Sequence, residues 1–330
     1  MAVTANTNET YDVSTIREDL SEAMASITPT ETLLMSTIGT RNVDNTYFEW
    51  SEVDLAATGA NRQIEGDVGL SNTAPTNAVR KGGYTQISAK VVEVSSTNQA
   101  VNGVANAQTV AKQVAYKLSE LKRDMEAMLL DNVAANAGAS GTARATAGLP
   151  AFLTSNVSRG SSGANGTTSG TGEAGFVNAA ATDGTLRPIT EALLKGVIAD
   201  CWNAGATPKI VMCGSAQKQK ISTFTGNATR YKEAEDSKLN AAIDVYISDF
   251  GEVQIVPNRH MRVRTVSSVD YTPDVLVLDP SYAEVAYLQT AKQEPLAKTG
   301  LSERRLISCE YGLQVTSQKA HGIVADINAS

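Results

Sequence analysis

The feature that most restricts how this chain can fold is a long polar excursion between two strand-like segments. Thr46–Leu55 (TYFEWSEVDL) alternates, with Phe48 and Trp50 on one face, and Tyr84–Val94 (YTQISAKVVEV) is a second extended segment. The roughly thirty residues between them carry hardly any apolar side chains and far exceed an ordinary connection in length. A ribbon of two strands is marginally stable alone in water, and the rest of the sequence offers no surplus apolar partner. We therefore expect the ribbon to lie on a neighbouring copy of the chain.

A single apolar stripe predicts one long helix from Gln108 to about Asn136. Its apolar positions recur every three or four residues, at Val110, Val114, Leu118, Leu121, Met125, Leu129 and Val133. At 1.5 Å per residue this helix would span roughly 40 Å. Charged residues fill much of the remainder, including Glu120, Asp124 and Glu126, and we expect them to form a solvated face.

The N-terminal segment is polar over residues 1–12 and then predicts two helices. The first has an apolar face within residues 13–27. The second is expected to begin at Thr28 as cap, with Pro29 in the first turn and Glu31 completing a capping box, and to end at Gly39.

The second half of the chain predicts a compact α/β unit followed by long strands. Thr190 is expected to cap a helix that ends at Gly205, and Ser215 to cap another that runs to Ile221. Expected strands are Lys209–Cys213, the hairpin Ile243–Ser248 with Glu252–Pro257, Asp274–Leu278, Ala283–Gln289, Glu303–Thr316 and Ala320–Ile327. Within Glu303–Thr316, Ile307, Cys309, Tyr311, Leu313 and Val315 lie on one face.

Between these parts lies a Gly/Ser/Thr-rich segment, Ser155–Gly175, which we interpret as a flexible loop. Gly170, Gly172 and Gly175 formally match a dinucleotide-binding G-x-G-x-x-G. That motif needs a preceding strand and a helix opening on it, because the pyrophosphate rests on the helix N-terminus. Neither is expected here, so the match does not predict a cofactor site.

Composition excludes several functional classes. The net charge of −7 and the isoelectric point near 5.1 argue against tight binding of nucleic acid, which needs clustered Lys and Arg.

The three cysteines, Cys201, Cys213 and Cys309, form no C-x-x-C pair and are expected to be buried free thiols. The two histidines, His260 and His321, are expected to be satisfied structural residues rather than metal ligands. CGSAQ, around Ser215, lacks the glycines of a nucleophile elbow. No catalytic, metal or cofactor residues are therefore predicted.

The start, MAVTANTNET, has neither a basic nor an apolar region typical of a secretion signal, and no apolar run reaches the length of a membrane span. We therefore expect a soluble product made in the cytoplasm, without a membrane partner.

The order of these segments resembles the major capsid proteins of tailed bacteriophages with the Hong Kong 97 fold. The resemblance covers most of the chain and is carried by ITPTETLLMSTIG, NTYFEWSEVDL, GGYTQISAKVVEVSSTNQAV, KLSELKRDMEAMLL and TGLSERRLISCEYGLQVTSQKAHGIVADI. It implies an α+β fold with an N-terminal arm, an extended β-ribbon loop that lies over the adjacent subunit, a long spine helix, and peripheral and axial domains. The implied division is 1–45 for the arm and short helices, 46–97 for the extended loop, 98–175 for the first peripheral part with the spine helix, 176–271 for the axial domain and 272–330 for the second peripheral part.

The resemblance also implies a function. Such a chain self-assembles into pentamers and hexamers that form an icosahedral head around double-stranded DNA, without sequence-specific binding. Its implied partners are scaffolding and portal proteins, and a decoration protein in some heads. The protein would be assembled in the host bacterial cytoplasm and end in the virion.

Charged residues of the ribbon are our candidates for inter-subunit contacts. We expect acidic side chains to meet basic patches on the neighbour and basic side chains to do the reverse. The candidates are Glu49, Glu52, Asp54, Arg62, Glu65, Asp67, Arg80 and Lys81. Two other functional classes stay open at this point. A surface-array or adhesive protein would share the Thr/Asn/Gly-rich strands but should carry a secretion signal, and a hydrolase on the α/β unit would need a convergent pocket.

Overall fold

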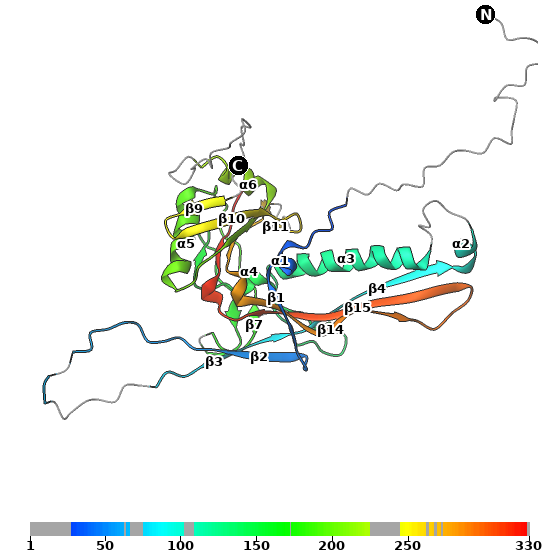
Figure 1. Ribbon diagram of the computed structural model, residues 1–330, viewed down its shortest axis with the longest axis horizontal. Helices are drawn as coiled ribbons and strands as arrows, with labels where there is room; N and C mark the ends of the chain where they lie inside the picture. Colours follow the sequence, from blue (N-terminus) through cyan, green and yellow to red (C-terminus); the bar gives the residue numbers. More distant parts are fainter. Residues whose placement is uncertain are drawn as a thin grey trace, which may run out of the picture.

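The computed structural model describes residues 28–62, 64–66, 75–101, 109–171, 173–224, 245–261, 264–266, 269–271 and 273–328. Within these residues a six-stranded sheet forms a compact lobe, a four-stranded sheet with a long helix extends to one side, and a two-stranded ribbon projects in the opposite direction (Figure 1). The helix expected within residues 13–27 lies outside the described residues.

The four-stranded sheet has the order β1-β14-β15-β4. Its strands are β1 (Gly39–Asn42), β4 (Gln86–Ser95), β14 (Ala283–Pro295) and β15 (Ser302–Val315). β1 pairs with β14 in parallel and the other pairs are antiparallel. The alternation predicted for the last long strand is confirmed, because Ile307, Cys309, Tyr311, Leu313 and Val315 are all buried in the main core.

Helix α3 (Val110–Leu130) covers one face of this sheet, and its predicted apolar stripe is confirmed. Val110, Val114 and Leu118 pack against the core, and Leu121, Met125 and Leu129 are buried in it. The Thr109 side chain caps the helix by accepting a hydrogen bond from the Lys112 backbone N–H at 3.4 Å. The expected end at Asn136 was too late.

The helix ends at Leu130 because the backbone beyond it pairs with other segments. The carbonyl oxygen of Val133 accepts from the Gly148 N–H at 3.0 Å, and the Ala135 N–H donates to the Val177 carbonyl oxygen at 2.9 Å. These bonds replace the helical hydrogen bonds that residues 131–136 would otherwise make.

Glu126 contradicts the expectation of a fully solvated charged face on α3. Its side chain is 0% exposed, and one carboxylate oxygen accepts from the Leu34 N–H at 2.6 Å and from Asn258 Nδ2 at 2.8 Å. The other oxygen accepts from the Met35 N–H at 3.0 Å. Glu126 therefore joins the long helix to the N-terminal segment and to the loop that follows β10.

This contact also explains why the expected cap at Thr28 is wrong. Helix α1 (Leu33–Thr37) begins four residues beyond Pro29 and has no side-chain cap bond of its own at Thr32. Its first backbone N–H groups are satisfied instead by the Glu126 carboxylate.

The six-stranded sheet has the order β5-β16-β13-β8-β10-β9. Its strands are β5 (Val157–Ser158), β8 (Ile210–Cys213), β9 (Val245–Ser248), β10 (Gly251–Pro257), β13 (Val275–Leu278) and β16 (Gly322–Val324). The predicted β9–β10 hairpin is confirmed. β5, β13 and β16 come from outside residues 176–271, so this sheet combines segments from before and after that range.

Two helices pack on this sheet. α5 (Glu191–Asn203) is capped by Thr190, whose side chain accepts from the Leu193 N–H at 3.4 Å, as predicted. α6 (Ser215–Ile221) has Gly214 as its N-cap, so the prediction of Ser215 as the cap is wrong; Ser215 is the first helical residue and makes no cap bond. Leu194, Val197 and Ile221 join the buried cluster beneath both helices.

The remaining elements are short. They are α2 (Ser96–Ala100), α4 (Leu149–Phe152), β6 (Thr167–Thr168), β7 (Val177–Ala179), β11 (Arg264–Val266), β12 (Val269–Tyr271), η2 (Pro280–Tyr282) and η3 (Gln318–Ala320).

The Gly/Ser/Thr-rich segment is held in place, so its interpretation as a flexible loop is wrong. Asp326 is 0% exposed, and its carboxylate accepts from the Gly160 N–H at 2.8 Å and from the Gly184 N–H at 2.9 Å. β6 pairs with β7 across the same segment. The glycine motif is followed by strand β7 and not by a helix, which agrees with the absence of a dinucleotide fingerprint.

The ribbon consists of β2 (Tyr47–Glu52) and β3 (Val79–Tyr84). The expected return limb, Tyr84–Val94, was placed wrongly, since Gln86–Ser95 is β4 and pairs with β15. A second expectation also fails: the ribbon does have an apolar partner in its own chain. Phe48 and Trp50 are buried against Ala286, with Phe152 and Leu288 beside them.

Small residues make room for these aromatic rings. A Cβ atom on Gly312 would lie 2.8 Å from the Phe48 ring, so a glycine at this place in β15 permits the close approach. The ribbon therefore has a buried root, β2–β3, and only the chain beyond that root lacks support.

We expect Glu126→Ala to lower the free energy of unfolding by roughly 2–4 kcal/mol, because three donors, two of them in buried hydrogen bonds, lose their acceptor. Urea denaturation of the unassembled subunit measures this. Glu120→Ala on the same helix is the matched control and should cost under about 1 kcal/mol, since Glu120 makes only partly exposed ion pairs with Lys90 and Lys117. Equal losses in the two variants would contradict the assigned role of Glu126.

Candidate assembly surface around the ribbon

The root of the ribbon is fixed by aromatic contacts on its outer face. The Tyr47 and Tyr84 rings lie 4.8 Å apart, and Tyr84 meets Phe176 edge to face at 5.0 Å. Tyr47 also lies across Gly82, where a Cβ atom would come within 2.3 Å of the tyrosine oxygen. Gly82 is therefore required for this stacking.

The backbone of β3 is bonded on both edges. β2 pairs along one edge, and on the other the Gly82 N–H donates to the Gly175 carbonyl oxygen at 2.9 Å while the Gly175 N–H donates to the Arg80 carbonyl oxygen at 2.9 Å. Gly175 has a φ of 79°, which favours glycine. The glycine-rich segment thus holds the ribbon root to the body of the subunit.

Lys81 provides the main electrostatic contact at the root. Its side chain is 8% exposed, and its Nζ forms ion pairs with Glu52 and, at 2.8 Å, with Glu173. Glu173 Oε1 accepts from Gln318 Nε2 at 2.8 Å. A buried ammonium group is costly without partners, so the two carboxylates are what permit Lys81 to lie here.

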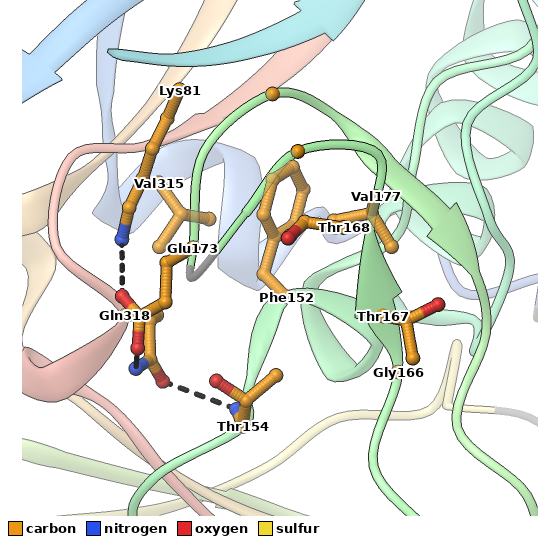
Figure 2. Close-up of a pocket in the computed structure, with 12 residues that line it drawn as sticks. Lys81, Phe152, Thr154, Gly166, Thr167, Thr168, Glu173, Val177, Val315 and Gln318 are labelled. Atoms are coloured by element: carbon orange, nitrogen blue, oxygen red, sulfur yellow. Dashed lines mark hydrogen bonds and ion pairs between the residues drawn. The ribbon is translucent and has the colours of Figure 1, made fainter. Parts of the chain in front are cut away.

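A cavity of about 390 Å³ lies beside this cluster (Figure 2). It is lined by Lys81, Phe152, Thr154, Gly166, Thr167, Thr168, Gly170, Glu173, Gly175, Val177, Val315 and Gln318. Gln318 Oε1 accepts from the backbone N–H groups of Thr154 and Ser155 at 3.1 and 3.2 Å. None of these lining residues is His or Cys, and the two ionisable ones, Lys81 and Glu173, pair with each other. The cavity has the polar contacts of a structural junction and no acid–base arrangement.

The structure places the predicted site residues in different surroundings. Glu52 and Lys81 form the buried cluster, Glu49 pairs with Arg80 on the outer face of the ribbon, and Asp54 pairs with Lys319. The hydrogen bond from Lys319 to Asp54 raises the pKa of that lysine. Arg62 and Glu65 are exposed, and Asp67 lies outside the described residues. An intermolecular role for these residues stays a prediction.

Beyond its root the ribbon exposes apolar side chains. We call residues 53–66 the ribbon tip. In it Val53, Leu55 and Ile64 are 54%, 84% and 80% exposed. Figure 1 shows this part of the chain extending away from the sheets. Single exposed apolar side chains are ordinary, but three such side chains in one projecting segment are typical of a surface that contacts another molecule.

The three cysteines and His321 are buried and neutral. Burial raises the pKa of Cys201 and Cys213 to about 12 and that of Cys309 to about 11, and all three are free buried thiols, as predicted. Burial lowers the pKa of His321 to about 4.

The expectation that both histidines are satisfied is wrong, because the Nε2 atoms of His260 and His321 are buried without a hydrogen-bond partner among the described residues. The other ring nitrogen of His321, Nδ1, accepts from the Asp279 N–H at 3.4 Å.

The described part of the chain has no cluster of His, Cys, Asp or Glu that could hold a metal ion. None of its helices is long and apolar enough to cross a membrane.

Comparison with known proteins accounts for this arrangement. The sequence profile of the SU10 major capsid protein family matches residues 3–328. The chain belongs to the SU10 major capsid protein family. It is 24% identical to the major capsid protein of Escherichia phage Phieco32 over 351 residues, covering 95% of each chain.

Solved capsid structures share the fold. The capsid of a native GTA particle superposes with a TM-score of 0.63 at 12% identity, covering 97% of this chain and 98% of that one. A structure from Mycobacterium phage Bobi gives a TM-score of 0.59 at 11% identity, with the same coverage. The expected α+β Hong Kong 97 fold is thereby confirmed. As an SU10-family capsid protein, the chain is a structural protein of an icosahedral phage head, located in the virion capsid, and not an enzyme.

Two residues that fix the ribbon root, Glu173 and Gln318, were not predicted from the sequence. Glu173 carried a usable signal, because it is the only charged residue between Gly160 and Phe176, in a segment of small residues. Gln318 carried none, since its partners are more than 140 positions away.

We expect Lys81→Met to loosen the ribbon root, because Glu52 and Glu173 would then face each other without a cation. Trp50 lies opposite Lys81 on the paired strand and reports on this directly. In a Trp202→Phe background, acrylamide quenching of Trp50 fluorescence should increase. Arg80→Met is the control, since the Arg80 side chain is 72% exposed and its ion pair with Glu49 is screened. Unchanged quenching in Lys81→Met would refute the role assigned to this lysine.

We expect stability to fall as the pH drops from about 6.5 to about 4, because the unfolded chain takes up a proton at His321 that the folded chain excludes. The folded pKa lies below the unfolded value, so this contribution is complete above pH 6.5 and lost at lower pH. It amounts to about 3 kcal/mol for this group. His321→Gln should show a shallower fall in urea denaturation over the same range. Identical pH profiles for the two proteins would contradict the assignment.

Proposed function

We propose that this protein assembles through pentameric and hexameric rings into a closed head that encloses double-stranded DNA. The observation that carries the proposal is the division of the ribbon into a root buried in its own subunit and a tip with exposed apolar side chains. A surface on one side of a subunit that fits a different surface on the next generates rings when the rotation closes.

Within such a ring we assign roles to the parts of the chain. Residues 1–45 act as the arm, 46–97 as the extended loop, 98–175 and 272–330 as the peripheral domain, and 176–271 as the axial domain around the ring centre. The elongated four-stranded sheet with α3 and the compact six-stranded lobe support a division into two such bodies. β13 and β16 lie within residues 275–324 but belong to the sheet of the compact lobe. The two bodies therefore share the segment that follows residue 271.

The exposed charges of the ribbon serve the contact between subunits in this proposal. Arg62 and Glu65 are exposed, and Arg80 is 72% exposed in its side chain. Glu49, Glu52, Asp54 and Lys81 are engaged within the subunit, so we assign them to shaping the ribbon first and to contacts of the rings second. Asp67 completes the set by its sequence position.

The partners follow from the same proposal. A separate scaffolding protein directs closure, a portal protein occupies one vertex, and a decoration protein can bind the outer surface. Assembly takes place in the host cytoplasm. The DNA is enclosed without sequence-specific contacts, which agrees with a net charge of −7.

Electron microscopy of the purified protein, alone and expressed with its neighbouring gene products, tests the proposal. We expect closed shells in at least the second preparation. Open sheets would favour a surface array, and monomers in both preparations would contradict the proposed assembly.

The same micrographs test the exposed charges of the ribbon. The double variant Arg62→Glu with Arg80→Glu should yield several-fold fewer shells, because two basic groups would then repel acidic partners on the next subunit. The charge-conserving pair Arg62→Lys with Arg80→Lys is the control and should retain assembly. Equal yields from both pairs would remove these residues from the interface.

A further inference from the structure

One side of helix α3 faces away from the body of the subunit. The apolar stripe between Val110 and Leu129 packs on the four-stranded sheet, and Figure 1 shows β4 and β15 along that side of the helix. At 3.6 residues per turn, the line directly opposite the stripe consists of Lys112, Tyr116, Ser119 and Arg123. Lys112 and Tyr116 are exposed, and Ser119 and Arg123 are partly exposed.

The acidic side chains of α3 are turned toward β4 and are neutralised there. Glu120 and Asp124 both form ion pairs with Lys90 of β4, and Glu120 also pairs with Lys117. The hydrogen bonds from Lys117 and Lys90 lower the pKa of Glu120, so this carboxylate stays charged within its pairs. The flank of the helix next to β4 therefore carries balanced charge.

The basic side chains on the outer side are not balanced in this way. Lys112, Lys122 and Arg123 form no ion pair with another residue that the structure describes. The Lys112 ammonium group lies over the Tyr116 ring, 5.9 Å from its centre, a contact that leaves the positive charge in place. We call Lys112, Tyr116, Lys122 and Arg123 the basic face of α3. Three unpaired positive charges on one side of a helix, in a chain of net charge −7, indicate an anionic partner.

Double-stranded DNA fits the basic face in charge and in shape. Lys112 and Arg123 are eleven residues apart, which is roughly 16 Å along the helix. Duplex DNA carries one negative charge per about 1.7 Å of its axis, so a duplex that lies along α3 presents several phosphates to this face. Lys and Arg side chains and a tyrosine hydroxyl are donors that bind phosphate oxygens without reading the base sequence.

We propose that the basic face of α3 contacts the phosphate backbone of the enclosed double-stranded DNA. The inference rests on the proposed function, because it needs DNA inside the shell and α3 directed toward the interior. DNA is favoured over an acidic protein segment, because the three positive charges lie on one straight helix and duplex DNA has continuous negative charge along a stiff axis.

This contact is compatible with the acidic composition of the chain. Each subunit offers only three charges, so one contact is weak and salt-dependent. Many copies in a shell can contact the same DNA molecule, and their weak contacts then add up. The net charge of −7 argues against tight binding by one subunit and not against this shared contact.

Formaldehyde crosslinking of DNA-filled particles tests the contact. Formaldehyde joins lysine amines to DNA bases at close range, and digestion with nuclease and protease then identifies the peptides that carry a nucleotide adduct. We expect adducts at Lys112 and Lys122 in DNA-filled particles and none in empty particles from the same density gradient. Lys209 and Lys298 are the controls, because both are exposed but lie next to β8 and between β14 and β15.

Adducts that are several-fold more frequent at the two α3 lysines than at the controls support the proposal. Equal or lower frequencies, or crosslinks that join α3 to a protein peptide in place of a nucleotide, overturn it and leave the proposed function intact. Closed particles that never contain DNA refute the proposed enclosure of DNA instead.

The salt dependence of DNA binding by the full-length subunit gives a second test. Fluorescence anisotropy with a labelled short duplex, started at low salt, measures the binding constant. Its logarithm should fall against the logarithm of the salt concentration with a slope of about −3, since each neutralised phosphate contributes about −0.9. The triple variant Lys112→Gln, Lys122→Gln and Arg123→Gln should bring this slope close to zero. Glutamine favours helices about as well as lysine, so α3 should persist, which circular dichroism checks.

The matched control removes three exposed charges elsewhere, by Lys209→Gln, Lys220→Gln and Lys298→Gln. This variant should retain the slope of the unmodified chain. Equal slopes for the α3 variant and the unmodified chain, or no binding by the unmodified chain at low salt, would overturn the assigned contact.

Discussion

The packing of Phe48 and Trp50 onto Ala286 and Gly312 is the contact on which the rest of the subunit's architecture depends. It fixes the ribbon root against one face of the four-stranded sheet, while α3 occupies the other face. Because the root is anchored, the direction in which the tip projects is determined by the fold. Lys81, held between Glu52 and Glu173, and the pairing of Gly82 with Gly175 secure the same root from the side of the glycine-rich segment. The chain therefore builds its own base for a segment that has too little apolar surface to fold alone.

The titratable groups of the core are used for position and not for reaction. Glu126 satisfies the first N–H groups of α1 and Asn258, and Asp326 satisfies two glycine N–H groups of the loop. Each joins segments that are far apart in the sequence. This agrees with membership of a capsid protein family, because such a protein has a structural and not a catalytic role.

Periodic features were predictable from the sequence, and long-range polar contacts were not. The stripe from Val110 to Leu129 and the alternation from Ile307 to Val315 each identify a core face without reference to any other segment. The end of α3 was misplaced because Val133 and Ala135 bond to distant residues. The ribbon was paired wrongly because Tyr84–Val94 has the composition of one continuous extended segment, and nothing local shows that the chain changes partner at Thr85. At the candidate site, sequence identified the ribbon charges but not Glu173 or Gln318, whose importance depends on where the glycine-rich segment folds back.

Hydrogen exchange measured on the free subunit and on assembled shells distinguishes a ribbon root fixed within the subunit from one fixed by assembly. Amides of β2 and β3 should be protected in both states, whereas amides of residues 53–62 and 64–66 should exchange freely in the free subunit and become protected in the shell. A ribbon tip protected already in the free subunit, or a root that gains protection only on assembly, would contradict this division into root and tip.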